Sequence, residues 1–188
     1  IGLEICNARA GIRMKSTEDT GSVMNGLWIE DCYIHDIKNI VSPSSKDELQ
    51  SDEYTAALED EELYMSYAIS TYKRLNAGLG YMENITVKNC VIDETDAPLT
   101  ISWAKNVAVE DCRFTNSYKQ GVLFSNINSA VTGNSYMKNC DVYNMGYTVG
   151  MYWGVAGVQF NSTRNFEMYD CEIAYTRNSG FPDGCGID

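Results

Sequence analysis

The chain has 188 residues, of which 44% are apolar, and its formal net charge at pH 7 is −12. This length supports one domain with a sizeable core, and no run of about 18 apolar residues is present that would predict a membrane-spanning helix. The excess of 26 acidic over 14 basic residues argues against a nucleic-acid-binding protein and against a protein that binds anionic membrane surfaces.

One short pattern recurs along the chain: alternating apolar residues, then Asn or Asp, then Cys, then alternating apolar residues again. A weak copy, LEICNARAGI at 3–12, has Ala8 in place of Cys. Five full copies follow at 27–37, 85–93, 107–115, 136–144 and 166–175. A base period of about 22 residues with insertions is typical of a solenoid, in which each repeat adds one coil.

The cysteines of the full copies share one position of the repeat: Cys32, Cys90, Cys112, Cys140 and Cys171. Because five side chains that point the same way cannot all pair, we expect buried free thiols rather than a disulfide framework. The sequence contains no C-x-x-C pair, which argues against a zinc ribbon or a redox motif.

Apolar residues alternate with polar ones within each copy, which predicts β-strands rather than helices. In the copy at 85–93, Ile85, Val87, Cys90 and Ile92 would face the core, with one corner at Asn89. Asn and Asp tolerate the left-handed backbone that a corner needs, and they hydrogen-bond readily in stacked ladders. The predicted corner column is Asn7, Asp31, Asn89, Asp111, Asn139 and Asp170.

Each repeat adds a further apolar segment, at 10–16, 67–74, 98–104, 121–126, 156–162 and, in part, 185–188. Three strands per coil predict an all-β, right-handed parallel β-helix of about six coils, spaced about 4.8 Å apart. We expect a single domain over 1–188, incomplete at both ends and part of a longer chain, since the sequence opens and stops inside a repeat. An acidic insertion at about 40–83 is expected to form a short helix or a solvated loop, with a calcium site as the alternative.

These repeats resemble those of the pectate-lyase-like superfamily of right-handed β-helices, over nearly the whole chain. The resemblance implies that a polysaccharide binds in a groove along the first strands of the coils, and that the protein is secreted or periplasmic, of bacterial type. The outward column on this face would run through Arg13, Thr100, Leu123, Gln159 and Asp188, beside a second column of Lys15, Ser102, Ser125 and Asn161.

Three aspartates are the candidate catalytic residues. Asp188 lies on the last of these strands and Asp183 in the loop that enters it, so their carboxylates could act as acid and base, or acid and nucleophile, in glycoside hydrolysis. Asp96 would lie at the same edge two coils earlier. The structural alternatives are turn residues at Asp183 and Asp96, and a solvated or calcium-binding carboxylate at Asp188.

Several side chains on the first-strand face are candidate substrate-binding residues. Arg13 and Lys15 could bind a uronate carboxylate, and either could supply the base of a lyase. Tyr72 lies on another first strand, and Gln159 and Asn161 belong to the two outward columns. Ordinary surface side chains are the alternative for Arg13, Lys15 and Tyr72.

Two further candidates lie beside this face. His35, the only histidine, would point outward near the groove edge, where it could be a general acid or base. Tyr152 and Trp153 lie in a glycine-rich loop, and exposed aromatic rings suit stacking against sugars. A solvated histidine and a self-packed loop are the alternatives.

We therefore predict a carbohydrate-active protein, a glycoside hydrolase acting on a polysaccharide, because acidic candidates outnumber basic ones around the groove. The partner would be a polysaccharide or oligosaccharide, with no nucleic acid and no membrane involved. No metal ligand set and no cofactor are expected, with Ca²⁺ as the open alternative. A lyase acting on uronic-acid polymers and a non-catalytic carbohydrate-binding or adhesin-type β-helix are the alternative functions.

Overall fold

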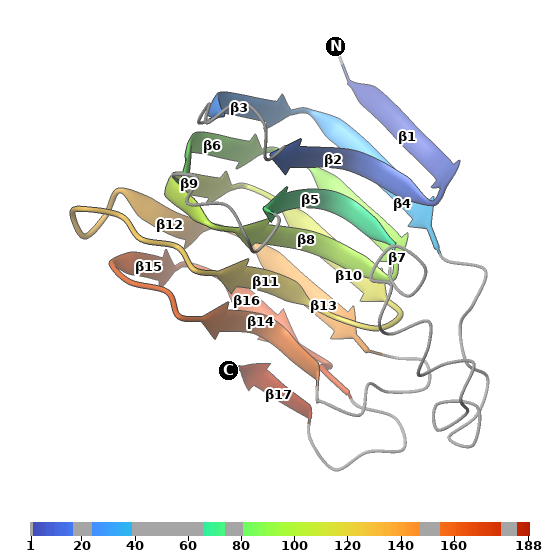
Figure 1. Cartoon of the computed structure of the whole chain (residues 1–188). Coiled ribbons are helices and arrows are strands. Elements are labelled where there is room, and N and C mark those ends of the chain that lie inside the picture. Colours follow the sequence, from blue (N-terminus) through green and yellow to red (C-terminus); the bar gives the residue numbers. More distant parts are fainter. Residues whose placement is uncertain (1, 17–23, 39–65, 74–80, 147–154, 178–183) are drawn as a thin grey trace, which may run out of the picture.

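The computed structural model describes residues 2–16, 24–38, 66–73, 81–146, 155–177 and 184–188. Within these ranges the chain forms seventeen β-strands in three parallel sheets (Figure 1). No helix in the described ranges is long and apolar enough to cross a membrane. Most of the insertion at about 40–83, where a helix or loop is expected, lies outside these ranges. Only residues 66–73 and 81–83 of it are described, and Tyr67–Lys73 form a strand.

The three sheets run along the length of the solenoid. Sheet A contains β1 (Leu3–Ala8), β4 (Cys32–Ile37), β7 (Val91–Thr95), β10 (Arg113–Ser117), β13 (Asp141–Met145) and β16 (Glu172–Ala174). Sheet B contains β2 (Ala10–Ser16), β5 (Tyr67–Lys73), β8 (Ala97–Ser102), β11 (Val122–Ser125), β14 (Val155–Asn161) and β17 (Gly184–Ile187). Sheet C contains β3 (Asn25–Glu30), β6 (Met82–Lys88), β9 (Ala104–Glu110), β12 (Ser135–Lys138) and β15 (Phe166–Tyr169).

Neighbouring strands of every sheet are three elements apart in the chain, so the chain visits sheets A, B and C in turn and then starts the next coil. The coils wind in a right-handed sense from β1 at one end to β17 at the other (Figure 1). The prediction of a right-handed parallel β-helix of six coils is confirmed. Its first strands form sheet B, its second strands sheet C and its third strands sheet A.

The corner between sheets C and A is built by left-handed Asn and Asp residues. Asp31, Asn89, Asp111, Asn139 and Asp170 all have φ between 49° and 55°. Asn89 Nδ2 donates to Asp31 Oδ1 at 2.5 Å, and Asn139 Nδ2 donates to Asp111 Oδ1 at 2.6 Å. The alternation of amide and carboxylate gives Asp31 and Asp111 each a donor from the next coil, which confirms the predicted ladder.

The first repeat is aligned differently from the sequence prediction. Strand β1 pairs with β4 in sheet A, with Leu3 opposite Cys32 and Ala8 opposite Ile37. Leu3, rather than Ala8, therefore stands at the cysteine position, and Asn7 belongs to the corner between sheets A and B. The prediction that Asn7 belongs to the corner between sheets C and A was therefore wrong. Asn7 lies opposite Asp36, and both residues are left-handed at the corner between sheets A and B, with φ of 52° and 54°. An Asn in the sequence does not by itself tell the two corners apart.

Inward side chains of the three sheets stack into one core. Ile34, Ile92, Phe114 and Val142 follow one another along sheet A and are fully buried. The five cysteines of the repeat position are free thiols, as expected, and all of them except the half-buried Cys171 are buried. Hydrogen bonds with Cys140 and Cys90, together with burial, raise the pKa of Cys112. The cysteines of the column act as small core residues.

A column of alternating charge follows the outer face of sheet C. Glu30, Lys88, Glu110 and Lys138 occupy equivalent positions on successive strands. Glu110 Oε2 lies 3.8 Å from Lys88 Nζ and 3.3 Å from Lys138 Nζ, and Tyr136 donates its hydroxyl hydrogen to Glu110 Oε1. The Tyr136 hydroxyl and the Lys138 ammonium lower the pKa of Glu110, while burial acts in the opposite direction.

We expect Glu110→Gln to lower the free energy of unfolding by about 1–2 kcal/mol at neutral pH, because charge-assisted hydrogen bonds are lost from a side chain that is only 14% exposed. A carboxylate whose pKa is depressed by folding stabilises the protein above its unfolded pKa of about 4.3, and the contribution disappears as pH falls through the folded pKa. The difference between the two proteins should therefore shrink below about pH 4.

Urea unfolding of both proteins at several pH values measures this difference. Glu30→Gln is the matched control, since Glu30 lies in the same column but is exposed, and its carboxylate accepts from the Trp28 indole, which an amide oxygen also does. An equal effect of the two substitutions at every pH would contradict the role assigned to Glu110.

Candidate functional site

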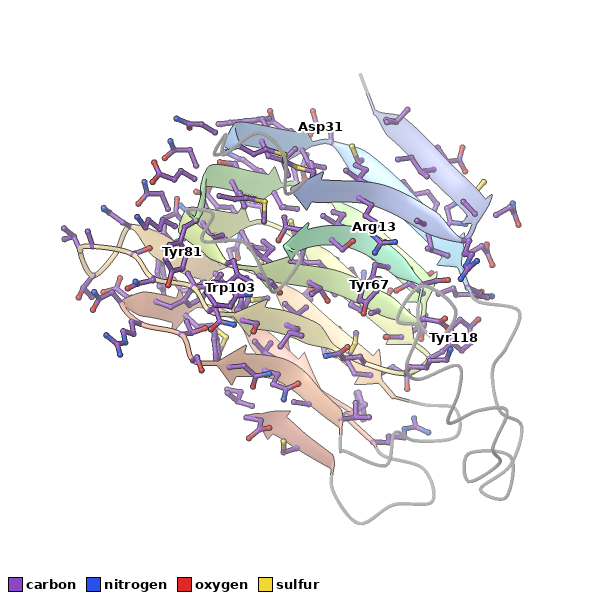
Figure 2. The ribbon with its side chains drawn as sticks, in the orientation of Figure 1. Arg13, Asp31, Tyr67, Tyr81, Trp103 and Tyr118 are labelled. Atoms are coloured by element: carbon purple, nitrogen blue, oxygen red, sulfur yellow. The ribbon has the colours of Figure 1, made fainter. Side chains whose placement is uncertain are left out.

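The polar column predicted on the first-strand face exists in the register of sheet B. Arg13 pairs with Ser70, Ser70 with Thr100, Thr100 with Leu123 and Leu123 with Gln159, and Arg13 lies at the β2 end of this column (Figure 2). Asp188 lies beside Gln159, because its N–H donates to Val158 O and its carbonyl accepts from Phe160 N–H. The column is not an open ledge, since Ser70 is 4% and Thr100 8% exposed.

The second predicted column is present in part. Ser102, Ser125 and Asn161 are in register on β8, β11 and β14. Lys15 pairs with Tyr72 through the backbones of β2 and β5, but their side chains lie outside the described part of the structure. Three more predicted site residues are wholly outside it: Tyr152, Trp153 and Asp183.

Asp96 is part of a buried ion pair at the corner between β7 and β8. Its Oδ2 lies 3.1 Å from Lys119 Nζ and accepts from the Ser66 backbone N–H at 3.2 Å. The side chains of Asp96 and Lys119 are 1% and 2% exposed. Burial lowers the pKa of Lys119, and the Asp96 carboxylate opposes that effect. This arrangement encloses the Asp96 carboxylate in the protein interior.

Asp96 and Asp188 do not form a pair. Strand β8, which follows Asp96, is separated from β17 by β11 and β14, so the two residues are three coils apart and not two as the sequence suggested. At about 4.8 Å per strand, three coils correspond to roughly 14 Å. Paired carboxylates of glycosidases are about 5–10 Å apart.

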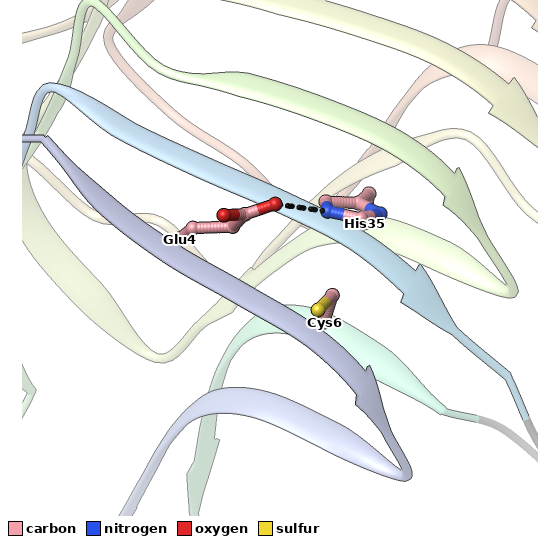
Figure 3. Close-up of side chains that lie close together, drawn as sticks. All are labelled: Glu4, Cys6 and His35. Atoms are coloured by element: carbon pink, nitrogen blue, oxygen red, sulfur yellow. Dashed lines mark hydrogen bonds and ion pairs between the residues drawn. The ribbon is translucent and has the colours of Figure 1, made fainter.

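His35 points outward from sheet A, as predicted, since Ile34 and Ile37 on the same strand are buried. Its Nε2 lies 3.0 Å from Glu4 Oε1 (Figure 3). Its Nδ1 lies 2.8 Å from Asp36 Oδ2. The ring stacks on Tyr33 with 4.3 Å between centroids. Hydrogen bonds with the Glu4 and Asp36 carboxylates raise the pKa of His35. The histidine therefore lies in an anionic cluster on sheet A, away from the sheet B column.

The outer face of sheet A also carries an open pocket of about 450 Å³. Two rows of outward side chains, which run from strand to strand, form this pocket. One row contains Val91 and Arg113, and the other contains Asp93 and Thr115. The lining residues are Val91, Asp93, Arg113, Thr115, Asn116, Tyr143 and Tyr175.

Hydrogen bonds fix the polar side of this pocket. Asp93 Oδ1 accepts from Thr115 Oγ1 at 2.7 Å and from Asn116 Nδ2 at 2.8 Å. The rings of Tyr143 and Tyr175 lie 6.5 Å apart, tilted by 40°. A hydrogen bond with Glu172 raises the pKa of Tyr143 to about 12. The pocket thus combines two aromatic rings, a guanidinium group and a carboxylate that is held in place by the neighbouring coil.

A second polar cluster lies beside the pocket, where sheet A turns into sheet B. Lys38 Nζ lies 3.0 Å from both Asp36 Oδ1 and Glu94 Oε2, and 4.6 Å from the centre of the Tyr118 ring. Although burial opposes it, hydrogen bonds with Tyr118, Asp36 and Glu94 raise the pKa of Lys38. The Lys38 ammonium links Asp36 on its own coil to Glu94 on the next, and its contact with the Tyr118 ring adds a third coil, that of β10.

The sheet A pocket was missed from the sequence, although a signal for it was present. Five of its residues stand one or three positions after a repeat cysteine, as Val91 and Asp93 do after Cys90, and the other two, Asn116 and Tyr175, stand four positions after one. Tabulating these outward positions for every coil would have shown the arginine, aspartate and tyrosine on one face. The first-strand face was favoured instead because of the family resemblance.

No family model, curated protein or solved structure matches this chain significantly. The function is therefore inferred from the fold and from the side chains on its faces.

Proposed function

We propose that this protein is a carbohydrate-binding β-helix that binds an extended polysaccharide across the outer face of sheet A. The observation that carries the proposal is the open pocket in which Tyr143 and Tyr175 stand beside Asp93 and Arg113. Sugars combine apolar ring faces with many hydroxyl groups. Aromatic side chains bind the former, and fixed carboxylate, amide and guanidinium groups bind the latter.

The shape of the face favours an extended ligand. The pocket is open to solvent, and its lining residue Val91 pairs with Tyr33 on β4, which is 41% exposed. Outward positions recur at the coil spacing of about 4.8 Å, so a chain lying along the solenoid axis would contact each coil in turn.

The charge of the protein favours a neutral polysaccharide over a uronic-acid polymer. The net charge is −12, and the rows on sheet A include Glu4, Asp93, Asp141 and Glu172 against Arg113. An acidic surface repels a polyanion, whereas it leaves binding of a neutral glycan unaffected.

Binding to a panel of neutral and uronic-acid polysaccharides, measured by affinity electrophoresis and calorimetry, tests the proposal. We expect binding to neutral polymers only, and a loss of at least about tenfold in affinity for Tyr175→Ala and for Arg113→Ala, which corresponds to about 1.4 kcal/mol each. Tyr175 is 72% exposed and Arg113 is also exposed, so replacing either side chain with alanine should leave the protein folded.

Trp28→Ala is the matched control, because Trp28 is an exposed aromatic residue on sheet C, on a different face of the solenoid. Its removal should leave the affinity unchanged. Loss of binding in the Trp28 variant with retention in the sheet A variants would move the site to sheet C. If none of the polymers binds, the proposal is contradicted for the polysaccharides tested.

A glycoside hydrolase is the second candidate function. The observation that favours it is the exposed Asp188 at the end of the sheet B column, beside the half-buried Gln159. The same panel, followed for reducing ends, tests it: release that disappears in Asp188→Asn would support hydrolysis with Asp188 in the site. Release accompanied by absorbance of unsaturated uronates would indicate a lyase instead, with Arg13 and Lys15 as candidates for the base.

A further inference from the structure

Three potential metal ligands of different chemistry come together at one end of sheet A. Glu4 and Cys6 lie on β1, and His35 lies on the neighbouring strand β4, directly opposite Cys6 (Figure 3). One ligand atom from each residue, a carboxylate oxygen, Sγ and an imidazole nitrogen, lies within 4.8 Å of the other two. The parallel pairing of β1 with β4 fixes the backbones that carry these side chains.

The neighbours of these ligands are those that a metal site needs. Asp36 Oδ2 lies 2.8 Å from His35 Nδ1, which leaves Nε2 as the nitrogen that faces Glu4. A carboxylate on the distal nitrogen orients a metal-binding imidazole and increases its basicity. Asn7 Nδ2 donates to Cys6 Sγ at 3.4 Å, which gives the sulfur a polar neighbour on its own strand. The ring of His35 is also held by its stacking on Tyr33.

We propose that Glu4, Cys6 and His35 form a binding site for a divalent transition metal of the zinc type, with water as the fourth ligand. A tetrahedral zinc ion with bonds of about 2.0–2.3 Å places its ligand atoms about 3.3–3.7 Å apart. The Glu4 oxygen and His35 Nε2 are already 3.0 Å apart. The Glu4 side chain is 66% exposed, so it is free of packing that would prevent this adjustment.

The donor set favours zinc over calcium and magnesium. Thiolate and imidazole are ligands of borderline and soft metals, whereas calcium and magnesium take oxygen ligands in larger number. One thiolate and one carboxylate neutralise a divalent ion, and the carboxylate of Asp36 adds further negative charge beside it. Glu4 is too exposed for its ion pair with His35 to stabilise the fold strongly.

Metal titration of the full chain under a non-thiol reductant tests the proposal. With Zn²⁺ and a chromophoric competitor we expect one ion per chain that Ca²⁺ and Mg²⁺ do not displace. With Co²⁺ as the spectroscopic probe we expect visible d–d bands of a four-coordinate ion and a thiolate-to-cobalt charge-transfer band. Cys6→Ser should remove the charge-transfer band and weaken Zn²⁺ binding at least tenfold, and His35→Gln should weaken it by a similar factor.

Two further variants separate the site from chance binding to other thiols. Asp36→Asn should weaken Zn²⁺ binding by about 10–100-fold while the charge-transfer band remains, because Asp36 acts through His35. Cys185→Ser is the matched control: Cys185 is a partly buried cysteine on β17, at the opposite end of the solenoid, and its replacement should change neither measurement.

The ligands lie on the outer face, so circular dichroism should show every variant folded. The proposal is overturned if Zn²⁺ does not bind at a 1:1 ratio, or if Cys6→Ser retains the charge-transfer band. The proposal is also overturned if Cys185→Ser, rather than Cys6→Ser, loses the charge-transfer band. The readout is independent of polysaccharide binding.

Discussion

Lys119→Met is expected to lower the free energy of unfolding by about 3–5 kcal/mol, because it leaves the Asp96 carboxylate buried without its cation. The ion pair is 3.1 Å long and almost fully enclosed. The backbone of Asp96 is equally constrained, since its carbonyl accepts hydrogen bonds from the N–H groups of Lys119 and Gln120 and from the Ser117 hydroxyl. The corner cannot open to solvate the carboxylate without losing these bonds.

Urea unfolding followed by tryptophan fluorescence measures the effect. Lys138→Met is the control, because Lys138 makes a 3.3 Å ion pair with its side chain 34% exposed, so its replacement should cost clearly less than that of Lys119. The double variant Asp96→Asn with Lys119→Met removes both charges and should recover part of the loss. Equal effects of the two single lysine variants would contradict the importance of the buried pair.

The buried ion pair also bears on the catalytic role expected for Asp96. A catalytic carboxylate must reach the substrate, whereas the structure encloses this one against Lys119. If Asp96→Asn lowered stability and polysaccharide binding were unchanged in the folded fraction, Asp96 would have a structural role. Loss of a measured activity at unchanged stability would restore the catalytic hypothesis.

Phe124→Ala is expected to have a similarly large effect, about 3–5 kcal/mol, because it opens a cavity in the core. The Phe124 ring is fully buried and lies 5.6 Å from the ring of Phe160 and 4.5 Å from that of Phe166. These rings come from β14 and β15 of the following coil, so the cavity would separate two coils that stabilise each other.

Leu123→Ala is the matched control for Phe124→Ala. Leu123 is the preceding residue of β11, but it points outward and is only half buried, so its truncation should cost clearly less. Chemical unfolding of both variants compares them directly. A cost at Leu123 equal to that at Phe124 would show that the alternation of inward and outward residues on β11 is wrong.

Local patterns in the sequence determined the architecture of this protein. Alternation as in Ile85 and Val87 requires a strand with one buried face, and this holds whatever the neighbours are. Asn89 and its equivalents predicted the corner, because the left-handed conformation is a property of the residue itself. The outward direction of His35 followed from the same alternation. These are short-range properties, so one sequence was sufficient to predict them.

Only the tertiary structure decided which side chains meet. The alignment of β1 with β4 depends on pairing between coils, and it placed Cys6 opposite His35, 29 positions along the chain. It also placed Lys119 against Asp96 and Arg113 beside Val91. Insertions of different length separate the coils, so sequence distance does not give spatial distance. Which residues form a buried pair, a pocket or a metal-binding cluster therefore depends on the register of stacked coils, which is fixed by packing over the whole solenoid.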